Sequence, residues 1–482
     1  MLIAGHFIGG PCDTSVPKAV IRSPYDGRLV GTAAEGDEAG LMTAVAAAHD
    51  AFKAWSLTAG TERATILERI AATVRERRAE LAELLVLEIG KPITLAEGEV
   101  DRLAITFDLA ANLAPGFGKE RLGLDFDPRG KNYRCEVERF PLGVVLAIVP
   151  YNWPYNLTAH KVAPALAVGN TVVIKPSPQA LLCTYALGRL LHECGVPPGV
   201  VNVVDAPIPA VHRAAQDERV KMVTFTGSDA IGWPLKASLP PEKKCTLELG
   251  GDASAIVFDG ADLGWACERI VSGAFAYAGQ ICISVQHVFV QDTIYDGFVA
   301  ELTEGTRGCH FGDPAVRATV SGPMISKAAA DRVEAWIAEA VAGGASVLVG
   351  GERRENVIAP CILNHVPPEA RLETSEVFGP VLTVEPFTTI EAAIERVNGS
   401  SYGLQAGVFT CDSAQADVCY RQLRVGAVIV NDHPTLRFDN FPYGGVKRSG
   451  FGREGVAYAM AEMSEPRTRI TRDLGGLDSL PS

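Results

Sequence analysis

The chain has 482 residues, of which 47% are hydrophobic and 21% are charged, and its formal net charge is −13. This size and composition fit two or three compact domains and exclude a disordered or fibrous chain. The acidic balance argues against nucleic-acid and anionic-membrane partners, because both select basic surfaces. The longest uniform apolar run, residues 143–149, is too short to span a bilayer, and the amino-terminal stretch lacks a signal-peptide pattern. We therefore expect a cytoplasmic protein that acts on a small molecule.

The cysteine and histidine pattern gives no sign of a metal centre. The eleven cysteines are scattered, odd in number and free of any C-x-x-C pair, and the nine histidines are dispersed. The zinc-binding pattern H-E-x-x-H is also absent. We expect reduced thiols and no metal.

The first clear element is an amphipathic helix predicted over residues 62–89. Thr61 precedes it as a candidate N-cap, and Gly90 follows as a stop signal. Its apolar stripe includes Ile66, Ile70 and Val74.

Further along the chain, short β-branched runs alternate with helical stretches. Continuous apolar runs of this kind predict parallel strands buried on both faces, and hence a doubly wound α/β sheet. The polar segment 121–143 predicts a protruding hairpin. The predicted strands of the first region are 143–149, 171–175, 200–204 and 221–225, and those of a second α/β region include 254–258, 287–291 and 426–431.

One cysteine stands in a context that suggests chemistry. Cys282 lies in FAYAGQICISVQ, residues 275–286, where Gly279 would permit a close approach of the backbone. A lone cysteine is more often a small buried apolar residue. A nucleophilic thiol also needs a base and a donor that holds the oxyanion.

Both partners have candidates in the sequence. Glu248 lies in CTLELGG at the end of a predicted strand, where desolvation between leucines would raise its pKa toward that of a general base. The alternative is a surface carboxylate. Asn152 in PYNWP offers a side-chain amide that could donate to an oxyanion, and the alternative there is a turn former.

Two further loops could contact a phosphate or a ribose. Gly227 and Ser228 stand at a strand-to-helix junction, with Gly232 beyond, where free N–H groups and the helix dipole favour an anion. Lys175 in IKPSP ends another predicted strand, although a solvated lysine would give the same pattern.

Together these stretches resemble the aldehyde dehydrogenase superfamily, specifically its NAD(P)-dependent, non-acylating members. The resemblance covers essentially the whole chain, and the motifs occur in the family's order. They are PYNWP, IKPS, FTGS-x-x-x-G, LELGG, GQIC, EVFGPV at 376–381, YGLQAGVFT at 402–410 and FPYGGVKRSGFGREG at 441–455.

The resemblance implies that an aldehyde is oxidised to a carboxylic acid through a covalent intermediate. The thiolate of Cys282 would attack the aldehyde, Asn152 and the Cys282 backbone N–H would hold the oxyanion, and hydride would pass to the nicotinamide. Glu248 would then activate water to hydrolyse the thioester.

The resemblance also assigns a cofactor site for NAD or NADP. It implies Glu376 at the nicotinamide ribose, Phe378 beside the ring, Lys175 at the adenosine ribose and Ser228 at the pyrophosphate. The complete implied set is Ile148, Pro150, Tyr151, Lys175, Ser177, Pro178, Gly227, Ser228, Leu249, Glu376 and Phe378.

The implied fold has two doubly wound α/β domains, one cofactor-binding and one catalytic, plus a small β oligomerisation element. Residues 1–120 and 142–247 would form the dinucleotide-binding domain, and residues 248–454 the catalytic domain. Residues 121–141 and 455–482 would form the oligomerisation arm of a homodimer or homotetramer.

The chain departs from the family pattern at three places. NAD-preferring relatives usually place Glu where this chain has Pro178, and losing that carboxylate removes repulsion against a 2′-phosphate, so NADP should be accepted as well as NAD. Residues 205–207 replace a common glycine near the adenine. The family's second glutamate in the C-terminal motif aligns with Ala457, so we expect no glutamate proton relay.

The residues expected at the substrate point in two directions. The resemblance implies an apolar entrance lined by Trp153, Leu157, Ile281 and Ile283, which favours neutral or small hydroxy-aldehydes. Arg102 and Arg437 match positions near the tunnel in relatives that take anionic aldehydes, which makes these the second candidate. Such relatives often carry an arginine where this chain has Ile281. For a neutral substrate, Arg437→Ala should change turnover by less than about tenfold.

Two other classes of function remain as alternatives. A thiol hydrolase or a CoA-dependent acyl transferase would use Cys282 without redox chemistry, but the sequence assigns no histidine partner, and Glu248 favours hydrolysis over transfer to CoA. A non-catalytic protein on the same scaffold would bind cofactor without turnover.

Overall fold

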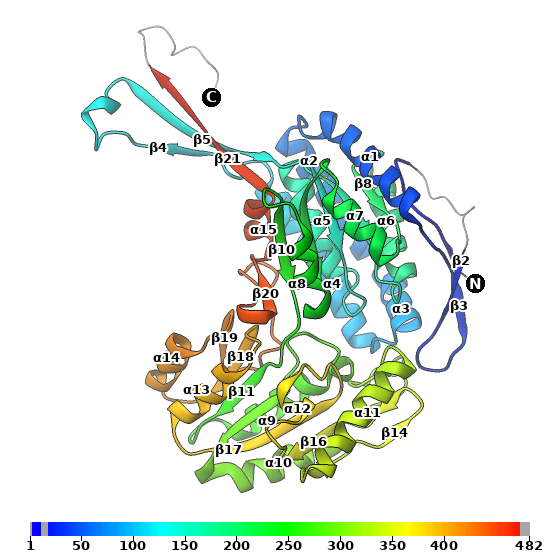
Figure 1. The fold of residues 1–482 in the computed structure, drawn as a ribbon, viewed down its shortest axis with the longest axis vertical. Coiled ribbons are helices and arrows are strands. Elements are labelled where there is room, and N and C mark those ends of the chain that lie inside the picture. Colours follow the sequence, from blue (N-terminus) through cyan, green and yellow to red (C-terminus); the bar gives the residue numbers. More distant parts are fainter. Residues whose placement is uncertain (1, 11–17, 473–482) are drawn as a thin grey trace.

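The computed structural model describes residues 2–10 and 18–472. Figure 1 shows two α/β bodies stacked along the long axis of the molecule, with a β arm projecting from the upper one. The upper body contains the amino-terminal third of the chain, and the lower body is built mainly from its second half.

The upper body is built on a six-stranded sheet of order β20-β10-β9-β6-β7-β8. Five strands are parallel, and β20 pairs antiparallel with β10. All four strands predicted for the first region are confirmed, with small differences at their ends. The strands are β6 (Val144–Ile148), β7 (Thr171–Lys175), β8 (Val201–Val203), β9 (Val220–Thr226), β10 (Lys244–Glu248) and β20 (Gly450–Phe451).

The strands of this sheet are apolar throughout because both faces are covered. In β6, Val144 and Leu146 pack into one hydrophobic core, while Val145 and Ala147 pack into another on the opposite face. One face carries α1 (Glu38–Trp55), α7 (Ile208–Gln216) and α8 (Asp229–Ser238). The other carries α2 (Gly60–Glu76), α3 (Arg78–Ile89), α4 (Ile93–Leu113), α5 (Asn156–Val168) and α6 (Leu181–Glu193).

The prediction of a single helix over residues 62–89 is wrong in one respect, because the structure divides this segment at Arg77 into α2 and α3. Both helices pack on α4 and both contact α6, but α2 also packs against α5, so the chain bends where these surfaces diverge. Helix α2 begins at Gly60 with Ala59 at its N-cap position, ahead of the predicted Thr61. Gly90 ends α3 in a left-handed conformation, as predicted.

The lower body is built on a seven-stranded sheet of order β13-β16-β17-β12-β11-β18-β19, in which only β13 is antiparallel to its neighbour. Its strands are β11 (Ser254–Val257), β12 (His287–Gln291), β13 (Ser346–Val349), β16 (Cys361–Asn364), β17 (Val381–Phe387), β18 (Gln405–Phe409) and β19 (Ala427–Val430). The helices around it are α9 (Leu263–Phe275), α10 (Tyr295–Arg307), α11 (Lys327–Ala342), α12 (Arg371–Thr374), α13 (Ile390–Gly399) and α14 (Ser413–Gln422).

The predicted hairpin forms the projecting arm. Its strands β4 (Glu120–Leu122) and β5 (Tyr133–Pro141) are joined by β21 (Ser464–Arg472), which pairs antiparallel with β5 along its whole length. Helix α15 (Val456–Glu462), just before β21, packs on α5 of the upper body. Residues 473–482 of the predicted arm lie outside the described residues, and the division into three domains stays a prediction. Smaller elements are β1 (Leu2–Ala4), β2 (Lys18–Arg22) and β3 (Leu29–Ala34), and the hairpin β14 (Arg353–Arg354) with β15 (Val357–Ile358).

Candidate active site

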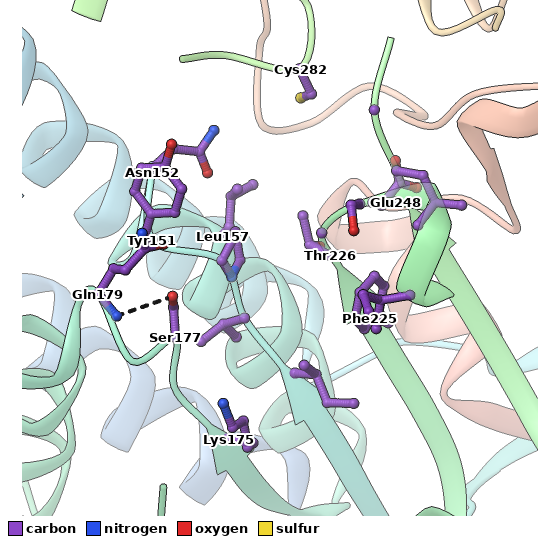
Figure 2. A pocket seen from close by; sticks show the side chains of 18 of the residues that line it. Tyr151, Asn152, Leu157, Lys175, Ser177, Gln179, Phe225, Thr226, Glu248 and Cys282 are labelled. Atoms are coloured by element: carbon purple, nitrogen blue, oxygen red, sulfur yellow. Dashed lines mark hydrogen bonds between the residues drawn. The ribbon is translucent and has the colours of Figure 1, made fainter. Parts of the chain in front are cut away.

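A cavity of about 550 Å³ lies at the carboxyl ends of β6, β7, β9 and β10. Parallel strands bring these ends to one edge of the sheet, where doubly wound folds commonly bind ligands. Figure 2 shows Lys175 at the end of one strand and Cys282 at the far end of the cavity, with Asn152 and Glu248 on opposite sides. Every predicted cofactor residue lines it: Ile148, Pro150, Tyr151, Lys175, Ser177, Pro178, Gly227, Ser228, Leu249, Glu376 and Phe378.

A second cavity of about 180 Å³ meets the first at the thiol. Cys282 and Leu157 line both cavities. All six predicted substrate residues line the smaller one: Arg102, Trp153, Leu157, Ile281, Ile283 and Arg437. The structure thus brings together every residue that the sequence analysis selected, and the thiol stands where a molecule in one cavity would meet a molecule in the other.

A left-handed turn places the thiol. Tyr277, Ala278 and Gly279 have φ angles of +52°, +54° and +65°, a conformation that costs non-glycine residues about 1 to 2 kcal/mol each. A Cβ on Gly279 would lie 2.1 Å from the carbonyl oxygen of Gly379. The glycine expected to permit a close approach does so toward this backbone, and it thereby lets Cys282 reach the junction of the cavities.

Asn152 is fixed against the loop that carries the thiol. Its Nδ2 donates to the carbonyl oxygen of Gln280 at 2.9 Å, and its Oδ1 accepts from the Trp153 N–H at 3.1 Å. The buried Gln280 side chain accepts in turn from the Tyr151 hydroxyl and from the Ile325 N–H. Among the described residues the second N–H of the Asn152 amide has no acceptor, so it is available to an oxyanion near Cys282.

A buried ion pair supports the segment that follows Asn152. The Glu99 carboxylate accepts from the N–H groups of Tyr155 and Asn156 at 2.8 and 3.2 Å and pairs with Lys91. The Lys91 ammonium lies 3.7 Å from the centre of the Trp153 ring. Burial lowers the pKa of Lys91 to about 8, and Glu99 opposes that shift. The sequence analysis did not select this pair, because Lys91, between α3 and α4, and Glu99, on α4, belong to none of the motifs that it used.

Glu248 ends β10 with both carboxylate oxygens buried and without a hydrogen-bond partner among the described residues. Room for the carboxylate comes from Gly444, where a Cβ would lie 2.7 Å from Oε1. Burial raises the pKa of Glu248 well above its ordinary value, and the charge of Glu454 adds to the rise. The predicted desolvation of this carboxyl is confirmed.

The sequence analysis expected no glutamate proton relay, and it overlooked a glutamate that lies near Glu248 at a position other than 457. The structure places Glu454, and not Ala457, close enough to influence its titration. Glu454 accepts from Lys161 Nζ at 2.7 Å and from Arg437 Nη2 at 3.2 Å. Burial opposes its ionisation, but these two cations outweigh burial and lower its pKa to about 2. The available sequence signal was the Gly-Arg-Glu triplet within FPYGGVKRSGFGREG, three residues before the position considered.

Tyr443 is a second residue that the sequence analysis missed, although it lies inside the same motif. Its hydroxyl lies 3.2 Å from the Cys282 Sγ. Burial raises the pKa of the Cys282 thiol to about 11, and the hydrogen bond with Tyr443 acts in the opposite direction.

The cavity of about 550 Å³ is called the long cavity below, and the one of about 180 Å³ the short cavity. Away from Cys282, the long cavity offers charged side chains and backbone N–H groups to a nucleotide. Glu376 accepts from the Gly251 N–H at 3.1 Å, and burial raises its pKa to about 8. Lys175 Nζ lies 3.4 Å from an Asp205 oxygen, and Ser228, at the N-cap position of α8, makes no side-chain cap hydrogen bond. Lining residues that the sequence analysis missed include Gln179, Ile208, Val211, His212, Thr226, Ile231 and Arg332.

The two arginines of the small cavity differ in their partners. Arg102 forms a two-point ion pair with Asp439, which also bonds His160 and Asn156. Arg437 pairs with one oxygen of Glu454, while its buried Nε–H has no partner among the described residues. Arg437 therefore keeps an unused donor, whereas the Arg102 charge is matched by Asp439.

Within residues 2–10 and 18–472, no group of three or more His, Cys, Asp or Glu side chains could hold a metal ion. The ten cysteines in these ranges are free thiols. No helix in the same part of the chain has the length and apolar character needed to cross a bilayer.

Comparisons with known proteins identify the family. Residues 13–469 match the profile described as "Aldehyde dehydrogenase family". The chain belongs to the aldehyde dehydrogenase family. It is 38% identical over 464 residues to a 3-sulfolactaldehyde dehydrogenase of Priestia megaterium, covering 96% of this chain and 97% of the relative. It is thus an oxidoreductase that acts on aldehydes.

Solved structures agree with this membership. The structure of aldehyde dehydrogenase 21 from Physcomitrella patens, in complex with the reaction product succinate, has a TM-score of 0.95 and 37% identity, covering 98% of this chain and 99% of that one. An NADP-dependent glyceraldehyde-3-phosphate dehydrogenase from Bacillus halodurans C-125, complexed with NADP, has a TM-score of 0.94 and 34% identity, covering 98% and 100%. The predicted α/β fold and the predicted family are confirmed.

Proposed function

We propose that this aldehyde dehydrogenase oxidises a short polar aldehyde to the carboxylic acid with NAD or NADP, using Cys282 as nucleophile. The observation that carries the proposal is the position of Cys282, at the junction of a long cavity with a short one and between Asn152 and Glu248.

In the first step the Cys282 thiolate forms a bond to the aldehyde carbon, and the carbonyl oxygen becomes an oxyanion. The free N–H of Asn152 and the backbone N–H of Cys282 hold this oxygen. Because Asn152 is fixed by its bond to Gln280, its donor needs no reorganisation when the charge develops.

The long cavity suits a dinucleotide. Its volume, the uncapped start of α8 at Ser228, the Lys175 ammonium and the Glu376 carboxylate match a pyrophosphate and two riboses. A bound nicotinamide would supply the hydride acceptor, so that loss of hydride from the former aldehyde carbon and re-formation of its C=O bond would give a thioester on Cys282. Phe378 and Tyr151, whose rings meet edge to face, both line the long cavity and would hold the nicotinamide in place.

In the last step Glu248 takes a proton from water, whose oxygen bonds to the thioester carbon. The C–S bond breaks, the thiolate of Cys282 returns and the acid leaves. A carboxyl with a raised pKa is a stronger base than an exposed one, which suits this role. Glu454, which Lys161 and Arg437 hold as a carboxylate, adds its negative charge to the surroundings of Glu248 and so supports the raised pKa of this base.

Both cofactors should be accepted. Pro178 lines the long cavity, and no carboxylate stands at that position to repel a 2′-phosphate. The Bacillus halodurans relative, solved with NADP, supports the NADP half of this proposal. A preference for NAD over NADP above about a thousandfold would contradict this proposal. Without a carboxylate at position 178, the repulsion that would exclude the 2′-phosphate of NADP is missing.

The short cavity favours a small substrate. Its volume of about 180 Å³ fits a chain of a few carbons, and its walls combine Trp153, Leu157 and Ile283 with hydroxyls and guanidinium groups. We place α-hydroxy-aldehydes first. Anionic aldehydes are the second candidate, which the unused Nε–H of Arg437 favours. The sulfolactaldehyde enzyme of Priestia megaterium, whose named substrate carries both groups, supports a polar substrate of either kind.

The arm favours assembly into a homodimer or homotetramer. Among the described residues, strand β21 is paired on one edge only, and Ile470 and Tyr133 are exposed on this three-stranded sheet. An open edge of this kind readily pairs with another chain. Light scattering of the full chain and of one that ends before β21 would test this proposal.

The deciding experiment measures initial rates of NADH and NADPH formation over a panel of short aldehydes. The panel contains lactaldehyde, its 3-sulfonate, succinic semialdehyde and an unsubstituted aliphatic aldehyde of equal length. A higher kcat/KM for the hydroxylated than for the unsubstituted compound supports the first candidate, and highest values for the two anions support the second. No reduced cofactor with any aldehyde would overturn the proposed function.

A further inference from the structure

The phenol of Tyr443 is rigidly placed beside the nucleophile. Tyr443 pairs with Glu454 across an antiparallel bridge, with N···O distances of 3.0 and 2.7 Å. Its buried hydroxyl reaches to 3.2 Å from the Cys282 Sγ. Both ends of the side chain are thus fixed, and the phenol cannot turn away from the sulfur without breaking this packing.

The phenol acts as a donor in this contact. Burial raises the pKa of Tyr443 well above its ordinary value, and the nearby Cys282 adds to the rise, so the hydroxyl keeps its proton. The sulfur is the acceptor that the described residues offer to it. A proton that cannot leave and has one acceptor must point at that acceptor, most strongly when the sulfur is a thiolate.

Arg437 strengthens the donor. Its guanidinium carbon lies 3.7 Å from the centre of the Tyr443 ring, and Glu454 holds the group there. A cation over an aromatic face draws electron density from the ring, which polarises the phenolic O–H toward the sulfur. The same arginine therefore has a role that does not depend on the charge of the substrate.

We propose that Tyr443 is a catalytic residue that stabilises the Cys282 thiolate by donating a hydrogen bond to its sulfur. The proposal rests on the proposed role of Cys282 as nucleophile. The other titratable groups around the sulfur are Glu248 at the end of β10, Glu376 beyond α12 and Arg437 before β20. The two carboxylates oppose thiolate formation, while Arg437 and Tyr443 favour it. Of these four groups, Tyr443 is the one that forms a hydrogen bond with the sulfur within the described part of the chain.

The test titrates the thiol in the cofactor-free enzyme without any aldehyde, so it reads the thiolate even if the proposed oxidation fails. A rapid pH jump is followed by ultraviolet absorbance of the thiolate, with Cys282→Ala subtracted as blank. Tyr443→Phe keeps the ring and removes the donor, and Tyr458→Phe, an exposed tyrosine on α15, is the matched control. Thermal unfolding checks that all variants are folded.

We expect Tyr443→Phe to move the thiol midpoint upward by about one pH unit, because a hydrogen bond to an ionised group is lost. Tyr458→Phe should leave it unchanged. At about neutral pH, alkylation of Cys282 by iodoacetamide should slow about threefold, since the lost thiolate fraction is partly offset by higher nucleophilicity. An unchanged midpoint in folded Tyr443→Phe would overturn the proposal, because a merely structural phenol would alter access to the thiol and not its titration.

Discussion

The two cavities that meet at Cys282 differ in how the chain builds them. The long cavity is lined chiefly by consecutive strand ends of one sheet, so that each motif after a strand contributes to a common edge. The short cavity draws on segments as far apart as Arg102 and Tyr443. The strand-end wall of the long cavity is therefore a local property of a parallel sheet, whereas the short cavity, and the part of the long one formed by Cys282, Glu376 and Phe378, depend on how the two bodies pack. Chemistry that is common to the family can lie in the first while specificity varies in the second.

The largest effect is expected at the junction itself. Cys282→Ala should lower kcat by about 10⁴-fold or more with either cofactor, since no other group can form the covalent intermediate. Cofactor affinity, measured by quenching of tryptophan fluorescence, should change little, because the other lining residues remain. Residual turnover above a few per cent would mean that the two cavities do not share Cys282 as their reacting group.

A smaller loss of activity is expected from substituting Glu248, which lines the long cavity. Glu248→Gln should slow thioester hydrolysis by about 10² to 10⁴-fold. Hydride transfer should persist, giving a burst of reduced cofactor and an acyl adduct in the protein mass. The exposed carboxylate control Glu301→Gln should behave as wild type.

The pH profile gives a second test of the same residue. Because the base is the ionised form and burial raises the pKa of Glu248, wild-type kcat should rise with pH through that raised pKa and fall as acid protonates the carboxylate. The variant should lack this acidic limb. An identical limb in Glu248→Gln would assign it to another group.

The third largest effect is expected from a substitution in the long cavity that changes the preference between NADP and NAD. Pro178→Glu should lower kcat/KM for NADP relative to NAD by about tenfold to a hundredfold, because the new carboxylate repels a 2′-phosphate. Gln422→Glu adds the same charge at an exposed site in the lower body and should leave the ratio unchanged. Equal losses with both cofactors would show that Pro178 acts by shape and not by the absence of charge.

The smallest effect tests the short cavity. Arg437→Lys keeps a positive charge near Glu454 but loses the Nε–H, so kcat/KM for an anionic aldehyde should fall about tenfold. A neutral hydroxy-aldehyde should lose less than about threefold in kcat/KM by the same comparison. The exposed Arg421→Lys serves as control. Equal losses of kcat/KM for the anionic and the neutral aldehyde would contradict the proposal that Arg437 binds an anionic substrate. Arg437 would then act only through its contacts with Tyr443 and Glu454.

Much of the fold and site could be predicted because the responsible signals are local. The strand 171–175 is matched residue for residue, since a β-branched run bounded by turn residues has few other conformations. The break at Arg77 could not be predicted, because α2 and α3 join without glycine or proline and bend to follow different neighbours. Glu454 and Tyr443 were missed for a related reason. Their motif was recognised, but which of its side chains face Cys282 and Glu248 depends on a turn that sequence spacing does not define.

By itself the sequence determined the family and the α/β class, and it selected Cys282, Asn152 and Glu248 as candidate catalytic groups. Residue type and order are enough for this, because each of these candidates belongs to a short continuous motif. The tertiary structure alone decided the electrostatics around them. It buried Glu248 without a partner, set Glu454 beside it and placed a phenol on the sulfur. Burial and neighbouring charge act through space, so the titration of a group depends on contacts between residues that the chain order keeps far apart.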